Sequence, residues 1–233
     1  MIDFQHVTKT YGKETPILAD ISFHVEPGEF IFLTGKSGAG KTTIMRLLTH
    51  QVTPDEGTIT FDEHEYATIK PKDILNVRRN IGVIYQDYKL LPEKTVAENI
   101  ALGLEIARKT PEEITSRITD LLTLIDLPGR ERVFPSQLSG GEAQRVCIAR
   151  ALAIAPKVIF ADEPTGNLDD ANGLMIVSLL LKLNELGTTV IMATHNNAFV
   201  KQFGKRRLHL EGNKLTVDEK HEEKPKKTKA NKT

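Results

Sequence analysis

Residues 35–42 combine glycines with a lysine and a threonine, the residue types that together bind phosphate groups. Glycines at 35, 38 and 40 allow a tight turn in which successive backbone amides point at one anion. We expect Lys41 to reach the β- and γ-phosphates of a nucleotide and the Thr42 hydroxyl to bind Mg²⁺. The predicted ATP-binding residues of this loop are Gly35, Lys36, Ser37, Gly38, Ala39, Gly40, Lys41, Thr42 and Thr43.

A pair of acidic residues follows an apolar run of strand length at residues 158–161. Open α/β sheets bind ligands at the carboxyl ends of their strands, where Asp162 and Glu163 would emerge. Asp162 is then placed to hold Mg²⁺ and Glu163 to polarise an attacking water. The alternative is a strand end with two solvated acids, and the independent phosphate loop favours the catalytic interpretation.

The elements around these residues support the same chemistry. Residues 29–33 are predicted to form a buried strand that enters the phosphate loop, and residues 43–48 an amphipathic helix that leaves it, which argues against a chance glycine-rich turn. Further along, Ser139, Gly140 and Gly141 open a predicted helix and offer a second anion site at a helix N-terminus. One chain therefore carries two phosphate-binding signatures.

The segment 138–145, followed by the Asp-Glu strand, resembles the signature of the ATP-binding-cassette ATPases. The resemblance implies a homodimer that forms on ATP binding, with two subunits packed head to tail so that the signature of one completes the γ-phosphate site of the other. It also implies roles for four more positions. These are Tyr11, stacking on adenine; Gln86, sensing Mg²⁺ and the attacking water; Asp169, in the loop 167–169 that crosses the dimer interface; and His195, contacting the γ-phosphate. For Tyr11 a half-buried turn tyrosine is the alternative.

Periodicity and resemblance together predict an α/β fold, a P-loop NTPase core interrupted by a helical subdomain. The core is expected at residues 1–86 and 157–217, and the helical subdomain at about 87–156. Within them we expect a strand at 57–61, a polar loop at 62–72, a helix at 96–108, and a helix that Thr110 and Glu113 open with a capping box. Residues 218–233 are predicted to be a disordered basic tail, either attracted to anionic lipid or merely solubilising.

Composition narrows the class of protein. The 233 residues carry no net charge, which gives no argument for nucleic-acid binding. No run of eighteen apolar residues spans a membrane, and the N-terminus does not read as a signal peptide, so we expect a cytoplasmic protein. The single cysteine, Cys147, cannot form an internal disulfide and is predicted to be buried.

Within the family, the stretches 32–42, 81–91 and 161–169 resemble the cell-division ATPases. This resemblance implies a peripheral protein on the inner face of the cell membrane, whose dimerisation acts on an integral membrane partner to regulate cell-wall hydrolases outside. The alternative is the ATPase motor of a true transporter of the lipoprotein-releasing or macrolide-efflux type. A nucleic-acid-linked ATPase is disfavoured, because such cassettes usually carry two phosphate loops.

Overall fold

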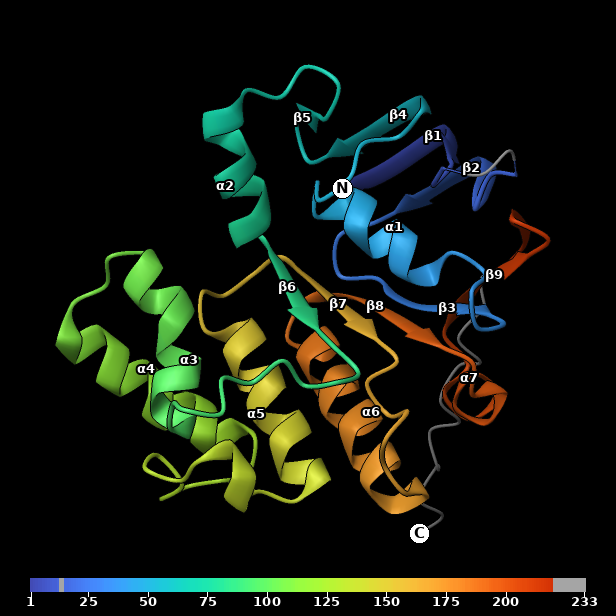
Figure 1. The fold of residues 1–233 in the computed structure, drawn as a ribbon. Helices are drawn as coiled ribbons and strands as arrows, with labels where there is room; N and C mark the ends of the chain where they lie inside the picture. Colours follow the sequence, from blue (N-terminus) through green and yellow to red (C-terminus); the bar gives the residue numbers. More distant parts are fainter. Residues whose placement is uncertain (13–14, 220–233) are drawn as a thin grey trace, which may run out of the picture.

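The computed structural model describes residues 1–12 and 15–219 and contains two sheets with helices on either side (Figure 1). The smaller sheet is antiparallel, in the order β2-β1-β4-β5. The larger sheet has the order β10-β9-β3-β8-β7-β6, and all its neighbouring strands are parallel except β10 and β9. The strands are β1 (Ile2–Lys9), β2 (Leu18–Val25), β3 (Phe30–Gly35), β4 (Glu56–Phe61), β5 (His64–Glu65), β6 (Ile81–Ile84), β7 (Val158–Asp162), β8 (Thr189–Thr194), β9 (Arg206–Glu211) and β10 (Lys214–Glu219).

The helices fall into two groups (Figure 1). Helix α1 lies between the two sheets, whereas α3, α4 and α5 form a cluster beside β6 and β7, with α6 packed next to α5. Their bounds are α1 (Lys41–Leu48), α2 (Pro71–Arg79), α3 (Val96–Ile106), α4 (Pro111–Leu124), α5 (Gly140–Leu152), α6 (Asp170–Glu185) and α7 (Asn197–Phe203).

Two hydrophobic cores meet at the larger sheet, because its central strands are buried on both faces. In β3, Phe30 and Phe32 point into the core shared with α3, α4, α5 and α6, whereas Ile31 and Leu33 point into the core shared with α1 and the smaller sheet. Alternate side chains of a strand point to opposite faces, so a strand covered on both sides must be apolar throughout. All of β3 is accordingly buried, and the phosphate loop that follows it has a rigid base.

Several expected elements are present with small changes in their bounds. The capping box at Thr110 and Glu113 opens α4, and α3 ends at Ile106, two residues before the expected end. The segment expected as a polar loop at 62–72 instead holds β5 and the first residues of α2. The sequence analysis did not predict helix α2, whose apolar stripe of Ile74 and Val77 is short and includes one buried residue, Val77.

The two sheets are joined near the end of the described chain by the buried Arg206. Its guanidinium group pairs with Glu29 at 3.0 Å and Asp218 at 2.6 Å, and it donates to the His24 carbonyl at 2.7 Å. Strand β10 runs to Glu219, so the sheet extends two residues beyond the expected boundary at 217. Residues 220–233, which hold the predicted basic tail, lie outside the described residues. No helix of the described chain is long and apolar enough to cross a membrane.

Candidate functional site

The phosphate loop connects β3 to α1 in a conformation that depends on glycine. Gly38 and Gly40 have φ angles of 79° and 103°, in the left-handed region that other residues rarely adopt. Gly40 also packs closely, because a Cβ atom there would lie 2.5 Å from Cδ2 of Leu18. The loop therefore ends with its backbone amides at the N-terminus of α1, where the helix dipole favours an anion.

Lys41 is buried at the centre of the loop and is held by three oxygens. Its Nζ donates to the carbonyls of Gly35 at 2.8 Å and Lys36 at 3.3 Å, and lies 3.2 Å from Oε1 of Glu163. The other carboxylate oxygen of Glu163 lies 2.9 Å from Nδ1 of His195. The three side chains thus form a chain in which Glu163 is flanked by two basic groups.

Glu163 follows β7 in a constrained backbone conformation. Its φ of 49° lies in the left-handed region, and its amide donates to the carbonyl of Ala193 on β8 at 3.0 Å. Strained φ angles in non-glycine residues persist only where their surroundings impose them, and they gather at functional sites. The bond to Ala193 fixes the carboxylate of Glu163 above the phosphate loop.

Asp162, the neighbouring acid, faces α1. Its Oδ2 accepts a hydrogen bond from the Thr42 hydroxyl at 2.8 Å. Burial raises the pKa of Asp162 above its ordinary value, the hydrogen bond from Thr42 opposes this shift, and the charge of Glu163 adds to it. A carboxylate that burial disfavours as a free anion is a suitable ligand for a cation.

These residues line one cleft of about 740 Å³ above the phosphate loop. Tyr11, Gln86 and His195 reach it from three different segments, and Ile17 adds an apolar wall that the sequence analysis missed. Tyr11 is 42% exposed, with the Lys9 ammonium group 5.7 Å from its ring centroid, and the exposed part of the ring can stack on a base. Gly35 and Ala39 line an adjoining hollow of about 570 Å³ that shares Lys36, Ser37, Gly38 and His195 with the cleft.

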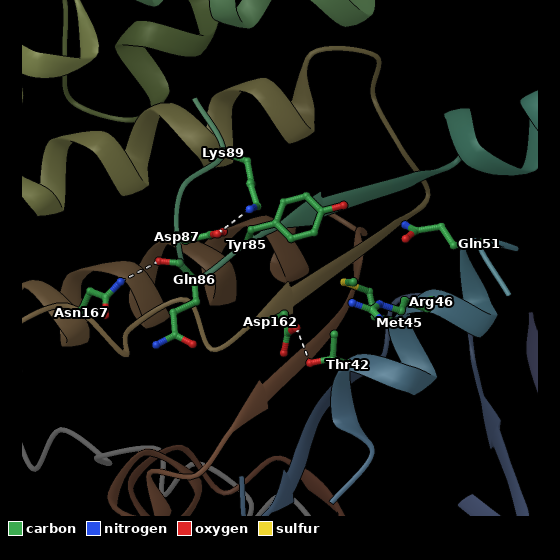
Figure 2. A pocket seen from close by; sticks show the side chains of 10 residues that line it. All are labelled: Thr42, Met45, Arg46, Gln51, Tyr85, Gln86, Asp87, Lys89, Asp162 and Asn167. Atoms are coloured by element: carbon green, nitrogen blue, oxygen red, sulfur yellow. Dashed lines mark hydrogen bonds and ion pairs between the residues drawn. The ribbon is translucent and has the colours of Figure 1, made fainter. Parts of the chain in front are cut away.

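A separate hollow, distinct from the cleft and from the hollow adjoining it, opens between α1 and the loop after β6 (Figure 2). Figure 2 shows the side chains of Gln86 and Asp162 on its wall beside Thr42. Asn167 donates to the backbone carbonyl of Gln86 at 3.0 Å and so ties this loop to the segment after β7. Arg46 also lines the hollow. The sequence signal that could have found Arg46 is its position four residues after Thr42, on the same helix face.

The predicted signature residues lie apart from the cleft, since its described lining contains no residue of the segment 138–142. Ser139 caps α5 through a capping box with Glu142, and Gly140 and Gly141 form its first turn. A Cβ atom at Gly141 would lie 2.6 Å from Oδ1 of Asn172, so the Asn172 side chain packs directly against the first turn of α5. Asp169 caps α6 by accepting from the Asn172 amide at 2.8 Å.

The donor set at the cleft fits Mg²⁺. Thr42 and Asp162 offer a hydroxyl and a carboxylate oxygen at hydrogen-bonding distance from each other, so one small cation can reach both. Mg²⁺ prefers oxygen ligands and usually combines one or two protein groups with substrate phosphates and water. The two side chains therefore suit a nucleotide-bound Mg²⁺, with Gln86 on the same wall.

Comparison with known proteins gives consistent matches. The ABC transporter family model matches residues 18–166. The chain is 44% identical to the cell division ATP-binding protein FtsE of Streptococcus pneumoniae serotype 2, over 94% of this chain and 95% of that protein. It is 43% identical to the protein of the same name from Escherichia coli K12, over 90% of this chain and 95% of that one.

Solved structures give the same result for the fold. The dimeric post-hydrolysis state of the ATP-binding cassette MJ0796, bound to ADP and Pi, aligns with a TM-score of 0.86 at 35% identity, covering 95% of this chain and 99% of that one. The structure of cbiO1 from Clostridium perfringens aligns with a TM-score of 0.85 at 28% identity, covering 94% and 88% of the two chains. The α/β fold class expected from the sequence is confirmed.

Proposed function

Because the chain belongs to the ATP-binding-cassette family and is an ATPase of that family, we propose that it drives a cell-division complex of the FtsE type. The observation that carries this proposal is identity of 44% along nearly the whole chain to a protein named for cell division, rather than a match to the family motifs alone. The family motifs are shared by many transport ATPases and would not separate the two roles.

In the proposed reaction, Tyr11 stacks on the adenine and the amides of residues 36–43 hold the phosphates of ATP. Lys41 leaves Glu163 and pairs with the β- and γ-phosphates, which frees the carboxylate to polarise the attacking water. His195 lies 2.9 Å from Glu163 and orients it, and contacts the γ-phosphate. Thr42, Asp162 and Gln86 would hold Mg²⁺, which would supply positive charge to neutralise the phosphates.

A second copy of the chain completes the site. Ser139 and Gly140 are exposed at the N-terminus of α5 and Gly141 is buried behind them, yet all three lie outside the cleft of their own chain. A head-to-tail homodimer formed on ATP binding gives these amides a γ-phosphate to bind, and brings Asp169 to the interface. Dimeric structures of related cassettes support the homodimer.

When the dimer closes on ATP, it changes the conformation of an integral membrane partner resembling FtsX. Binding to this partner holds the protein on the inner face of the cell membrane. The groove for this contact lies between the core and the helical subdomain, where Leu91, Leu102 and Ile154 form an apolar wall and Lys89 and Arg150 a basic one. A short amphipathic helix with an acidic side fits such a groove.

The experiment that tests this function is copurification of the membrane partner, followed by depletion of the protein in growing cells. We expect a partner with few spans and an extracytoplasmic domain, and filamentous cells with unsplit septa after depletion. A partner with a full transport pathway, and normal septation after depletion, would support the motor of a true transporter instead.

The basic segment 224–232, with five lysines and no acid, is proposed to add electrostatic attraction to anionic lipid. Removal of residues 220–233 tests this, because the cut leaves β10 and its Arg206 contacts complete. We expect the shortened protein to keep its ATPase activity and to lose salt-sensitive binding to phosphatidylserine vesicles. Equal vesicle binding by both proteins would show that the segment only solubilises the chain.

A further inference from the structure

The loop that follows Gln86 contains two successive residues in the left-handed region. Tyr88 and Lys89 have φ angles of 60° and 50°. Neither is glycine, so each conformation costs free energy and must be imposed by contacts from elsewhere. The groups that impose it decide where the chain around Gln86 lies.

Both carbonyls of this turn are held by α5. Arg150 donates from Nη2 to the Tyr88 carbonyl at 2.7 Å and from Nη1 to the Lys89 carbonyl at 2.5 Å. The thiol of Cys147 also donates to the Tyr88 carbonyl, at 3.0 Å. The guanidinium group is a planar fork that binds two acceptors in a fixed geometry, which a lysine cannot reproduce.

The thiol of Cys147 is suited to donate at every physiological pH. Cys147 is buried, and this burial raises the pKa of its thiol to about 12. The sulfur therefore keeps its hydrogen, and the turn receives a weak third donor beside the two from Arg150.

The same helix begins with the signature residues. Gly140, in its first turn, lies against the Tyr88 ring, since a Cβ atom built on it would be 3.0 Å from the Tyr88 hydroxyl. The turn thus contacts α5 near its start through the Tyr88 side chain and near its end through Arg150. On the other side, Asn167 holds the Gln86 carbonyl. A displacement of α5 must therefore move the loop that carries Gln86.

The face of α5 that meets this loop carries a buried polar side chain, that of Gln144. Gln144 is completely buried, and neither atom of its side-chain amide has a hydrogen-bond partner within residues 1–12 and 15–219. It lies four residues after Gly140 and three before Cys147, on the helix face that meets Tyr88. Gln144 therefore adds a buried polar group to the face of α5 that meets the loop, and buried polar groups are normally hydrogen-bonded.

We propose that Arg150 is a positioning residue for Gln86: by holding the Tyr88–Lys89 turn it keeps the Gln86 side chain beside Thr42 and Asp162 and couples it to the signature helix. This inference rests on the proposed role of Gln86 at the metal and the attacking water. When a second subunit engages the signature residues, α5 passes their displacement to Gln86 through Arg150.

The test compares Arg150→Gln and Arg150→Lys with a matched control, Arg117→Gln, in the full-length protein. Arg117 is a part-buried arginine of the helical subdomain that also donates to two backbone carbonyls, those of Leu152 and Ala153, but it does not touch the Gln86 loop. The measurements are kcat, the Kd for ATP, the Mg²⁺ concentration at half-maximal rate, and the melting temperature.

We expect Arg150→Gln to lower kcat by about tenfold to a hundredfold, the range typical of a misplaced reacting group. The Kd for ATP should change less than twofold, and half-saturation should require more Mg²⁺. Arg150→Lys should show the same loss of kcat in weaker form. It replaces the glutamine variant in the test if that variant fails to fold. Arg117→Gln should share the fall in melting temperature and keep the kcat and the Mg²⁺ requirement of the wild type.

A rescue variant separates positioning from general stability. Glycine adopts the left-handed region without strain, so Lys89→Gly in the Arg150→Gln background should recover part of the lost kcat. Equal kcat in the Arg150 and Arg117 variants, or loss of ATP binding in parallel with kcat, would overturn the proposal. The Gln86→Ala variant separates the role of Gln86 from the positioning role of Arg150. An unchanged kcat in Gln86→Ala would refute the role of Gln86 itself. A large loss of kcat in Gln86→Ala, together with normal kcat in the Arg150 variants, would refute only the positioning role of Arg150.

Discussion

Substitution of Glu163 by glutamine should separate nucleotide binding from hydrolysis. The amide keeps the shape of the side chain and can still accept from Lys41, but it carries no charge and is a far weaker base. Loss of a positioned general base costs about 10²- to 10⁴-fold in rate, which corresponds to about 3–5 kcal/mol of activation free energy. We therefore expect kcat to fall by that factor.

The structure also predicts the direction of the change in affinity. In the structure Nζ of Lys41 lies 3.2 Å from Oε1 of Glu163, and both side chains are largely buried. A phosphate must displace this partner, and a charge-assisted hydrogen bond contributes about 1.5–3 kcal/mol. Since Lys41 keeps two carbonyl partners and the amide oxygen, we expect the lower part of that range, or about tenfold tighter binding.

The assay combines equilibrium dialysis of labelled ATP with phosphate release at saturating ATP. Glu185→Gln, the same chemical change at an exposed position of α6, controls for general effects of the substitution. Wild-type turnover in the Glu163 variant would remove this residue from the role of base. Weaker ATP binding with the expected loss of turnover would refute competition between Glu163 and phosphate for Lys41.

Three further experiments test the shared ATP site, the groove for the membrane partner and the contribution of Glu113 to stability. Mixing Lys41→Ala with Ser139→Arg subunits should restore part of the ATPase activity that each variant lacks. Each heterodimer keeps one intact site, made of the phosphate loop of one subunit and the signature residues of the other. Heterodimers without activity would argue against this shared site. Leu91→Asp, in the groove, should abolish copurification of the membrane partner and leave ATPase activity unchanged. Leu90→Asp should instead lower the melting temperature, because Leu90 packs on the core. Retained copurification by the Leu91 variant would exclude the groove as the docking site. A lysine ammonium group and the capping backbone amide lower the pKa of Glu113, so its contribution to stability is present above its unfolded pKa and is lost as pH falls through the folded value. The melting temperature should therefore fall between about pH 5 and pH 3 less steeply in Glu113→Gln than in the wild type, and parallel profiles would contradict this.

The sequence predicted the parts of the site that lie in consecutive residues. The glycines of the phosphate loop, the strand that ends in Asp162, the capping box at Thr110 and the helix that Ser139 opens each depend on local geometry that a short segment specifies. Their chemistry can be derived before any tertiary contact is known.

Other features depend on contacts between distant segments. The pairing of Lys41 with Glu163 joins residues far apart in the sequence, and no local pattern predicts that a catalytic acid and a phosphate-binding lysine neutralise each other. The left-handed turn at Tyr88 and Lys89 is equally hidden, because both residues normally avoid that conformation and the distant residues Arg150 and Cys147 hold its carbonyls. The apolar stripe of helix α2 consists of Ile74 and Val77 alone, which is too short to define a helical period.

The Arg206 cluster has a practical consequence for measuring movement in this protein. Strand β10 forms the edge of the larger sheet, and the Asn213 carbonyl just before it accepts from the Ala19 amide of the smaller sheet at 2.8 Å. Together with the Arg206 ion pairs, this bond fixes the edge strand to both sheets. A fluorophore attached at position 217, within β10, would therefore move with the core as one rigid body, and a pair of such labels in a dimer would report the approach of two cores during each ATP cycle.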